Sequence, residues 1–288
     1  MKIVTYNIQF GLGRDGRFDL ERIARTVDGA DIIALQEVER NWQHSGGVDQ
    51  PDQLARHLSK YYWVYGPYFD VDASRRNPDG TVTNARRQFG NMILSKSPIH
   101  SMRLFTLPKS PVNDQHNMTV GMTEAVVDLG NDRAIRVYNT HLSAKSASDR
   151  ISQIHTIRRI IKRAPSQGGA WTGVGQAPIW GEDAVPPPMP DDFILLGDFN
   201  LSPNGPEYAH LVREDADECD LTDCWVLAGH RHDDGITFPA NPQGQQRIDF
   251  AFVGPRMKQQ PLTARIDEAA DGSDHQPYWV NLTGAAND

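Results

Sequence analysis

The sequence has no apolar run long enough to cross a membrane. Its longest such stretches, for example Phe193–Leu196, are far shorter than the roughly 18 residues that a membrane-spanning helix requires, and no run of the signal-peptide type follows Met1. Cysteine is scarce as well. The two cysteines, Cys219 and Cys224, lie so close together that a disulfide between them would close only a short loop. We therefore expect free thiols and a cytoplasmic protein that is not exported.

The sequence also lacks a surplus of positive charge. The formal net charge is −8, and basic and acidic residues number 17 and 16 in residues 1–144 but 12 and 21 in residues 145–288. A protein held on nucleic acid by a broad basic face gains most of its affinity from Lys and Arg that neutralise phosphates. The composition therefore argues against such binding, and it suits a metal site or a small substrate.

The apolar content is sufficient for a large folded core. Hydrophobic residues make up 39% of the 288 positions, and a chain of this size buries about 70 to 75% of its unfolded surface. A disordered or fibrous protein is thereby excluded, and the sequence contains no internal repeat. We expect residues 1–288 to form a single domain.

Short apolar runs rich in β-branched residues alternate with turn residues, and this pattern predicts strands. The runs are Ile3–Val4, Ile32–Leu35, Asn91–Leu94, Ala125–Val127, Ile135–Val137, Phe193–Leu196 and Ile248–Val253. Helical spacing appears from Leu20 to Val27, where Asp19 can cap the N-terminus, and again from Ile151 to Ile161. Because strands outnumber helices and many lack a crossover helix between them, we expect an α/β (α+β) fold of paired mixed sheets covered by helices.

Three charged or aromatic segments have two interpretations each. Five basic residues surround the second helix, and we interpret them as a solvated surface rather than a phosphate contact. They are Arg150, Arg158, Arg159, Lys162 and Arg163. Residues 66–90 and 164–192 are expected as long loops, and loops of this length are usually functional or disordered. Arg75, Arg76, Arg86 and Arg87 of the first loop form either a phosphate-binding rim or solvated charges. Trp171 and Trp180 of the second either line a pocket for a small, partly apolar ester or pack the loop onto the body.

Several predicted strands run directly into polar residues. The segments are Thr5-Tyr6-Asn7, Leu35-Gln36-Glu37, Tyr138-Asn139-Thr140-His141 and Gly197-Asp198-Phe199-Asn200. The ends of successive strands in open α/β folds converge on one edge, so these side chains are expected in one cleft. Arg247-Ile248-Asp249 and Ser273-Asp274-His275 add further acids and an imidazole. Oxygen ligands without paired cysteines favour Mg²⁺ or Mn²⁺ over zinc.

These six segments, together with Gly90–Pro98, resemble the ordered motifs of the endonuclease/exonuclease/phosphatase family. The six are spread from residue 5 to residue 275 in the order of the family's motifs. The resemblance implies a four-layer sandwich, in which two central mixed β-sheets are flanked by helices and the site lies at one end. It also implies hydrolysis of a phosphoester with a divalent metal.

The resemblance also implies a role for each matching residue. Glu37 is similar to the principal metal ligand, with Asn7 and Asp274 near the same ion. Asp198 and Asn200 match the pair that orients or deprotonates the attacking water. His141 matches a phosphate-oxygen donor, and Asp249 with His275 matches a carboxylate–imidazole dyad. Some nucleases of the family pair a second histidine with a glutamate, and no such partner for His141 is identifiable in the sequence.

Family resemblance does not determine the substrate, because one site can serve nucleic acids, lipids, sugars and nucleotides. The resemblance implies a metal-dependent hydrolase, preferably a phosphodiesterase, and from the acidic charge we expect its substrate to be a small or lipid-like phosphoester. The alternative is a structure-selective DNA or RNA endonuclease or exonuclease. A catalytically silent binding domain is the third interpretation, and the complete set of acids and imidazoles argues against it. No protein partner is evident in the sequence.

Overall fold

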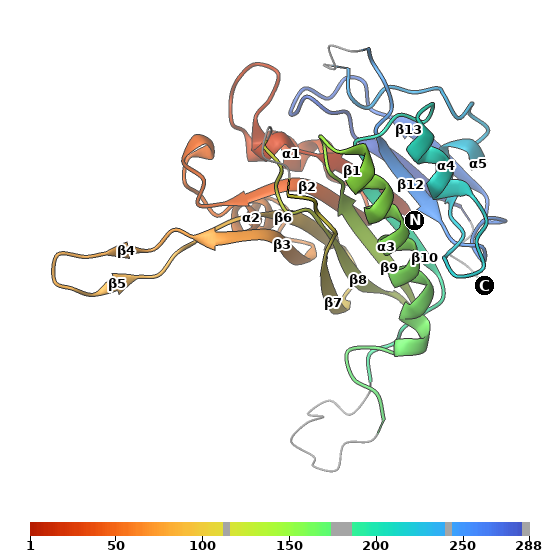
Figure 1. The fold of residues 1–288 in the computed structure, drawn as a ribbon, viewed down its shortest axis with the longest axis horizontal. Coiled ribbons are helices and arrows are strands. Elements are labelled where there is room, and N and C mark those ends of the chain that lie inside the picture. Colours follow the sequence, from red (N-terminus) through yellow and green to blue (C-terminus); the bar gives the residue numbers. More distant parts are fainter. Residues whose placement is uncertain (112–115, 174–185, 240–243, 284–288) are drawn as a thin grey trace.

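Two mixed β-sheets of six strands each form the centre of the molecule (Figure 1). The computed structural model describes residues 1–111, 116–173, 186–239 and 244–283. The first sheet has the strand order β13 (Leu262–Ile266), β14 (Tyr278–Leu282), β1 (Lys2–Asn7), β2 (Ile32–Arg40), β6 (Arg86–Ser95) and β3 (Tyr62–Asp72). The second has the order β11 (Thr222–Asp223), β12 (Asp249–Val253), β10 (Phe193–Asp198), β9 (Arg133–His141), β8 (Gly121–Gly130) and β7 (Ile99–Thr106). Strands β1 and β2 are parallel, as are β9 and β10, and the other pairs are antiparallel.

The two sheets pack face to face through apolar side chains. Ile3 and Ile93 of the first sheet, and Val137 and Leu196 of the second, belong to one buried cluster between them. Burial of such side chains contributes about 1.5 to 3 kcal/mol each, so this inner layer is a main source of stability. The short helix α5 (Cys224–Leu227) adds Cys224 to the same cluster.

Helices cover the outer face of each sheet. On the first sheet lie α1 (Leu20–Val27) and α2 (Gln50–His57), whose buried residues pack on Val4 and Ile33. On the second lie α3 (Ala147–Gln167) and α4 (Pro206–Val212), which pack on Leu195. Two single-turn 3-10 helices complete the elements, η1 (Gln9–Gly11) and η2 (Gln43–Ser45). The order helix, sheet, sheet, helix is the predicted four-layer sandwich.

The predicted strands and helices are found where the apolar patterns place them. Each strand run falls on β1, β2, β6, β8, β9, β10 or β12, and Leu20 to Val27 is α1 with the Asp19 carboxylate accepting the Arg22 N–H. Cys219 and Cys224 are free and buried, as predicted. Among the described residues, none of the helices combines the length and apolar character that a membrane span requires.

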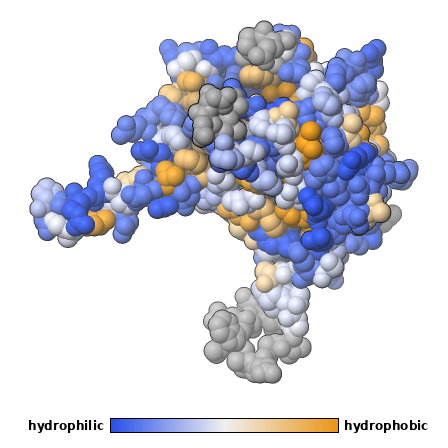
Figure 2. Space-filling view, in the orientation of Figure 1, coloured by the Kyte–Doolittle hydropathy of each residue, from blue (hydrophilic) through white to orange (hydrophobic). Residues whose placement is uncertain are grey.

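The expected loop at 66–90 is wrong. This segment holds the second half of β3, the short pair β4 (Arg75–Arg76) and β5 (Val82–Thr83), and the start of β6. Together they form a hairpin whose tip, residues 73–85, projects from the body as an arm (Figure 1). On the face shown in Figure 2 the arm is mostly hydrophilic. Its Arg, Asn, Asp and Gly residues therefore suit a solvated hairpin as well as a loop.

The segment 164–192 begins as the end of α3, which continues to Gln167. Described residues 168–173 and 186–192 have no regular helix or strand, and Trp171 is exposed. Trp180 lies outside the described residues. Arg158 of α3 is completely buried rather than solvated, because its guanidinium contacts Glu218 Oε2 at 2.9 Å and three backbone carbonyls.

Candidate active site

Neighbouring strands bring the sequence motifs to one end of the sandwich. The register pairs Asp198 of β10 with His141 of β9 on one side and with Asp249 of β12 on the other. In the other sheet, Asn7 and Gln36 form the last pair in the register of β1 and β2. The inner apolar layer lies between this pair and the strands of the second sheet. Residues separated by 29 to 57 positions thus become neighbours through strand pairing, as the convergence of strand ends predicts.

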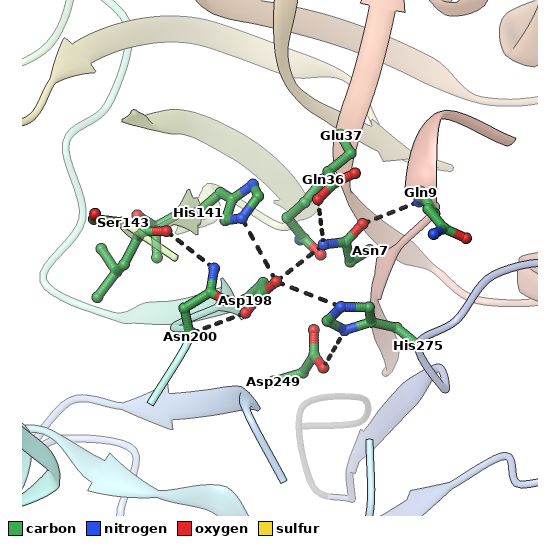
Figure 3. A network of polar contacts seen from close by, with 12 residues as sticks. Asn7, Gln9, Gln36, Glu37, His141, Ser143, Asp198, Asn200, Asp249 and His275 are labelled. Atoms are coloured by element: carbon green, nitrogen blue, oxygen red, sulfur yellow. Dashed lines mark hydrogen bonds and ion pairs between the residues drawn. The ribbon is translucent and has the colours of Figure 1, made fainter. Parts of the chain in front are cut away.

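Asp198 lies at the centre of the polar network (Figure 3). Its Oδ2 accepts a hydrogen bond from Asn7 Nδ2 at 2.9 Å, and it lies 3.6 Å from His141 Nε2 and 3.7 Å from His275 Nε2. Its other oxygen, Oδ1, accepts the Asn200 N–H at 2.8 Å. Both oxygens are therefore oriented by the protein, and the residue is 1% exposed.

Asp249 and His275 form the predicted dyad. Asp249 Oδ2 lies 2.8 Å from His275 Nδ1, and the Phe238 ring stacks on the imidazole with a centroid distance of 4.7 Å. Burial lowers the pKa of His275, but the carboxylates of Asp249 and Asp198 outweigh burial and raise this pKa to about 10. The imidazole is therefore a positive charge at neutral pH.

Glu37 is aimed into the site by a β-bulge. The register of β2 with β6 shifts between Leu35 and Val38, and Glu37 has φ 60°, in the left-handed region. A bulge inserts an extra residue and redirects side chains out of the regular alternation. As a result Gln36 turns to the inner layer while Glu37 Oε1 accepts a hydrogen bond from Asn7 Nδ2 at 3.1 Å.

The surroundings of Glu37 suit a cation. Burial raises the pKa of the Glu37 carboxyl, and no lysine or arginine in the described chain forms an ion pair with it. A half-buried carboxylate without a positive partner is costly, because part of its hydration is lost. Asp274 lines the same cleft, and the neighbouring Ser273 hydroxyl donates to the Asn7 carbonyl at 2.8 Å. The sequence therefore gathers oxygen donors where a hard cation would compensate their charge.

A second group of possible donors overlaps the catalytic set. Asp198, Asp249 and His275 each offer one possible ligand atom, and these three atoms lie within 4.8 Å of one another. His275 Nδ1 is already engaged by Asp249, and both His275 and His141 turn Nε2 toward Asp198. This group resembles a hydrogen-bonded dyad beside an acid more than an open metal site.

Asn200 is held partly by the backbone. It has φ 51°, and its Nδ2 donates to the Leu142 carbonyl at 3.0 Å. Together with the Asp198 contact, this bond fixes the turn that follows β10. The carboxamide thus links the β10 turn to the end of β9.

The network opens into a cleft of about 300 Å³. Its polar lining includes Glu37, His141, Asp198, Asn200, Asp274 and His275. Its walls include Tyr68, Phe89, Met118, Val120, Leu142, Phe238 and Ile248. The lining also includes His116 and Lys145, so the cleft combines acids and cationic or imidazole side chains with aromatic and aliphatic walls.

Three of the four expected substrate residues do not line this cleft, and the fourth, Trp180, lies outside the described residues. Among the described residues that line it, Arg86, Arg87 and Trp171 are absent. Arg86 pairs with Asp70 at 2.7 Å, and the Arg87 guanidinium lies 5.6 Å from the centroid of the Trp42 ring. The structure thus separates these residues from the acids and imidazoles.

Sequence reasoning missed several residues of the cleft. Phe238 and Tyr68 were not selected, although Tyr68 Oη lies 3.3 Å from His141 Nδ1. Tyr68 lies inside β3, where an aromatic residue is ordinary, and Phe238 lies outside the named strands in an irregular segment. No signal in the sequence therefore marked either of them. Arg247, the first residue of its motif, proves to be a buried partner of Asp223 at 3.0 Å outside the cleft.

Comparisons with known proteins agree with this arrangement. The sequence model described as "Endonuclease/Exonuclease/phosphatase family" matches residues 4–275. Among curated proteins none matches the chain. An endonuclease/exonuclease/phosphatase from Bacteroides vulgatus is similar in structure, with TM-score 0.67, 18% identity and 98% of both chains covered.

Two further solved structures share the fold. A mannosyl-6-phosphatase from Bacteroides thetaiotaomicron has TM-score 0.62 and 17% identity, with 98% of this chain and 99% of that chain covered. Sphingomyelinase C from Streptomyces griseocarneus has TM-score 0.55 and 16% identity, with the same coverage of 98% and 99%. At such identities the likeness concerns the fold.

Proposed function

The chain belongs to the endonuclease/exonuclease/phosphatase family, and from this premise we propose that it hydrolyses a small or lipid-like phosphodiester. Members of the family are phosphoesterase hydrolases, so the reaction class is phosphoester hydrolysis. The observation that carries the choice of substrate is the cleft, where acids and imidazoles meet walls of aromatic and aliphatic side chains. A mannosyl-6-phosphatase and a sphingomyelinase among the similar structures support a small or lipid-like phosphoester as substrate.

The family is generally dependent on a divalent metal, and we assign the ion as Mg²⁺ or Mn²⁺, held by Asn7, Glu37 and Asp274. The half-buried Glu37 carboxylate and the absence of thiolates near it fit a hard cation that takes one or two carboxylates and keeps several waters. When bound, the cation supplies positive charge to the phosphoryl oxygens.

Asp198 and Asn200 act on the attacking water. The two oxygens of Asp198 are oriented by Asn7 and by the Asn200 backbone N–H, so its carboxylate is held toward the cleft and can orient or deprotonate water. Placement of this kind replaces a random encounter by a fixed geometry. The Asn200 carboxamide holds the same turn against β9.

His275 and His141 meet the negative charge of the phosphate. Asp249 fixes the orientation of His275 and favours its charged form, so this imidazole offers an N–H and a positive charge. His141 presents Nε2 to the cleft from the opposite side of Asp198. Donors placed where charge develops lower the barrier mainly by electrostatics.

The alternative is a structure-selective nuclease. In that case the arginines of the hairpin would have to contact the phosphates of the nucleic acid. Arg86 is neutralised by Asp70, and Asp72 lies 4.0 Å from its guanidinium. Arg87 stacks on Trp42 instead of facing the cleft. These contacts, with the net charge of −8, favour the small ester.

The test is a panel of assays with and without added metal. It compares a chromogenic phosphodiester, a phosphomonoester, lipid head groups, plasmid DNA and an abasic duplex. We expect chelation to abolish hydrolysis, Mg²⁺ or Mn²⁺ to restore it, and Glu37→Gln to prevent restoration, because a neutral amide is a poorer ligand for a hard cation. The same change on the exposed surface of α1, Glu21→Gln, is the control and is expected to retain activity. Full turnover after chelation would overturn the metal assignment, and efficient cutting of plasmid at low enzyme would overturn the substrate class.

A further inference from the structure

Tyr68 lies in an irregularity of β3 on the wall of the cleft. Pro67 pairs with Gly90 and Phe69 pairs with Phe89, so Tyr68 has no partner across β6. The bulge at Glu37 in β2 lies opposite the same part of β6, on its other side. Bulges are frequent beside active sites, where they redirect a side chain. The two neighbours of β6 thus each aim one extra residue into the cleft.

The Tyr68 ring is tightly enclosed. It is 4% exposed, and the Phe89 ring packs against its edge with a centroid distance of 5.9 Å. A Cβ added to Gly121 would lie 2.5 Å from Tyr68 Cβ, so only glycine leaves room for the tyrosine there. Burial raises the pKa of the Tyr68 hydroxyl well above its ordinary value, and Glu37 raises it further. The phenol therefore stays protonated.

The hydroxyl contacts one nitrogen of His141 while the other faces the reacting groups. Tyr68 Oη lies 3.3 Å from His141 Nδ1, and His141 Nε2 lies 3.6 Å from Asp198 Oδ2. A neutral imidazole has one N–H and one lone pair. A phenol that donates to the Nδ1 lone pair leaves the proton on Nε2, which faces Asp198 in the cleft.

The two histidines beside Asp198 therefore have partners of different charge. His275 Nδ1 lies 2.8 Å from the Asp249 carboxylate, which stabilises an imidazolium. The neutral Tyr68 hydroxyl holds the His141 ring without adding negative charge. Asp198 thus lies between one histidine whose Nδ1 contacts a carboxylate and one whose Nδ1 contacts a hydroxyl.

We propose that Tyr68 is a positioning residue that holds the His141 ring through Nδ1, in the tautomer whose Nε2–H is aimed at a phosphoryl oxygen. In this arrangement His141 contributes a hydrogen bond whose direction is set by the Tyr68 hydroxyl. The inference rests on the proposed function, because it assigns His141 to a phosphoryl oxygen.

The kinetic test is Tyr68→Phe, which keeps the ring and removes the hydroxyl. We expect kcat on the chromogenic phosphodiester to fall about 3- to 10-fold, the range for loss of one neutral hydrogen bond, with KM nearly unchanged. Tyr65→Phe is the matched control, because Tyr65 lies on the same strand and its hydroxyl donates to the Val38 carbonyl at 3.0 Å. It is expected to retain kcat.

The dependence on His141 is tested in a second background. In His141→Gln, adding Tyr68→Phe should cause no further loss of kcat, because the two residues act as one unit. Equal losses in Tyr68→Phe and Tyr65→Phe, or additive losses in the double variant, would overturn the proposal.

A readout independent of catalysis is the ¹⁵N spectrum of the histidines. The His141 signals, identified by their absence in His141→Gln, should report the proton on Nε2 in the wild type and a mixture of tautomers in Tyr68→Phe. Tyr65→Phe should leave them unchanged. If no phosphoester is hydrolysed but the tautomer shifts, the proposed function fails while the positioning of His141 stands. If hydrolysis occurs but the tautomer is unaffected by Tyr68→Phe, the positioning is wrong.

Discussion

At the scale of single residues, the cleft is built from side chains that act through their neighbours. Asp249 is completely buried, and the contact with His275 Nδ1 at 2.8 Å is its link to the cleft. The Asp249 carboxylate therefore sets the orientation and charge of the imidazole instead of meeting substrate itself. Replacing either Asp249 or His275 should therefore impair the same step of the reaction.

This arrangement predicts the kinetics of three variants. His275→Ala should lower turnover about 10²- to 10⁴-fold, the range for a positioned proton-transfer group. Asp249→Asn should keep the fold and lower turnover substantially, and Asp249→Asn with His275→Ala should be little slower than His275→Ala alone. Rates and melting temperatures of the three proteins check this. Additive rate losses, or normal turnover with reduced thermal stability, would contradict a shared role.

The residues that the sequence reveals are those whose type is unusual for their place. An acid or amide directly after an apolar strand is conspicuous, and Asn7, Glu37 and Asp198 are indeed brought together. Tyr68 is not conspicuous, because aromatic residues are common in strands. Its contact with His141 depends on a bulge and on a partner 73 positions away. Arg158 was misjudged for a similar reason, since its partner Glu218 lies in a distant loop.

At the scale of elements, a buried polar network joins the two sheets beneath the cleft. Asn139 of β9 donates through Nδ2 to the carbonyls of Leu35 and Met92, at 2.9 and 3.0 Å, in the first sheet. Its Oδ1 accepts from Gln36 Nε2 at 2.7 Å. These carbonyls flank the bulge that presents Glu37, where the ladder with β6 is interrupted. The network therefore supports the bulge as well as the packing of the sheets.

Asn139→Leu is expected to destabilise the protein by about 3 to 5 kcal/mol, because the buried Leu35 and Met92 carbonyls would each lose the donor that Asn139 supplies. Urea unfolding monitored by tryptophan fluorescence measures this loss. Asn204→Leu, the same replacement at an exposed turn residue, serves as the control and should have little effect. A loss for Asn139→Leu no larger than that of the control would show that the network contributes nothing to stability.

Elements with a clear apolar period were predictable, and those defined by tertiary contacts were not. The helix from Leu20 to Val27 has an apolar face and a capping aspartate, so its bounds follow from the sequence. Strand β7 alternates between half-buried and exposed residues at the edge of its sheet and gives a weaker signal. The hairpin was mistaken for a loop because its strands β4 and β5 pair with each other outside the core.

At the scale of the whole molecule, charge and shape together bear on the substrate. The chain carries a net charge of −8, while the arm presents Arg75 and Arg76, both exposed, away from the body (Figure 1). A ligand as short as a small ester that fills the cleft would not reach the arm. A long polyanion bound at the cleft would have arginines to meet there. The arm therefore separates the two interpretations of the substrate.

The last prediction concerns removal of this arm. Ala73 and Ala85 already form a backbone hydrogen bond of 3.0 Å, so residues 74–84 can be replaced by Asn-Gly, which favours a two-residue hairpin turn. Because β4 and β5 pair only with each other among the described strands, we expect the melting temperature to change by less than about 2 °C, a fraction of a kcal/mol. For a small phosphodiester, kcat/KM should be unchanged and nearly independent of salt, because few phosphates are neutralised on binding.

Arg75→Ala with Arg76→Ala in the intact arm controls for charge without shortening the hairpin. If instead the substrate is nucleic acid, its affinity should fall steeply with salt, and either variant should reduce that slope by about two, one for each lost phosphate contact. Such a reduction, measured with plasmid or abasic duplex between low and physiological salt, would overturn the preference for a small ester.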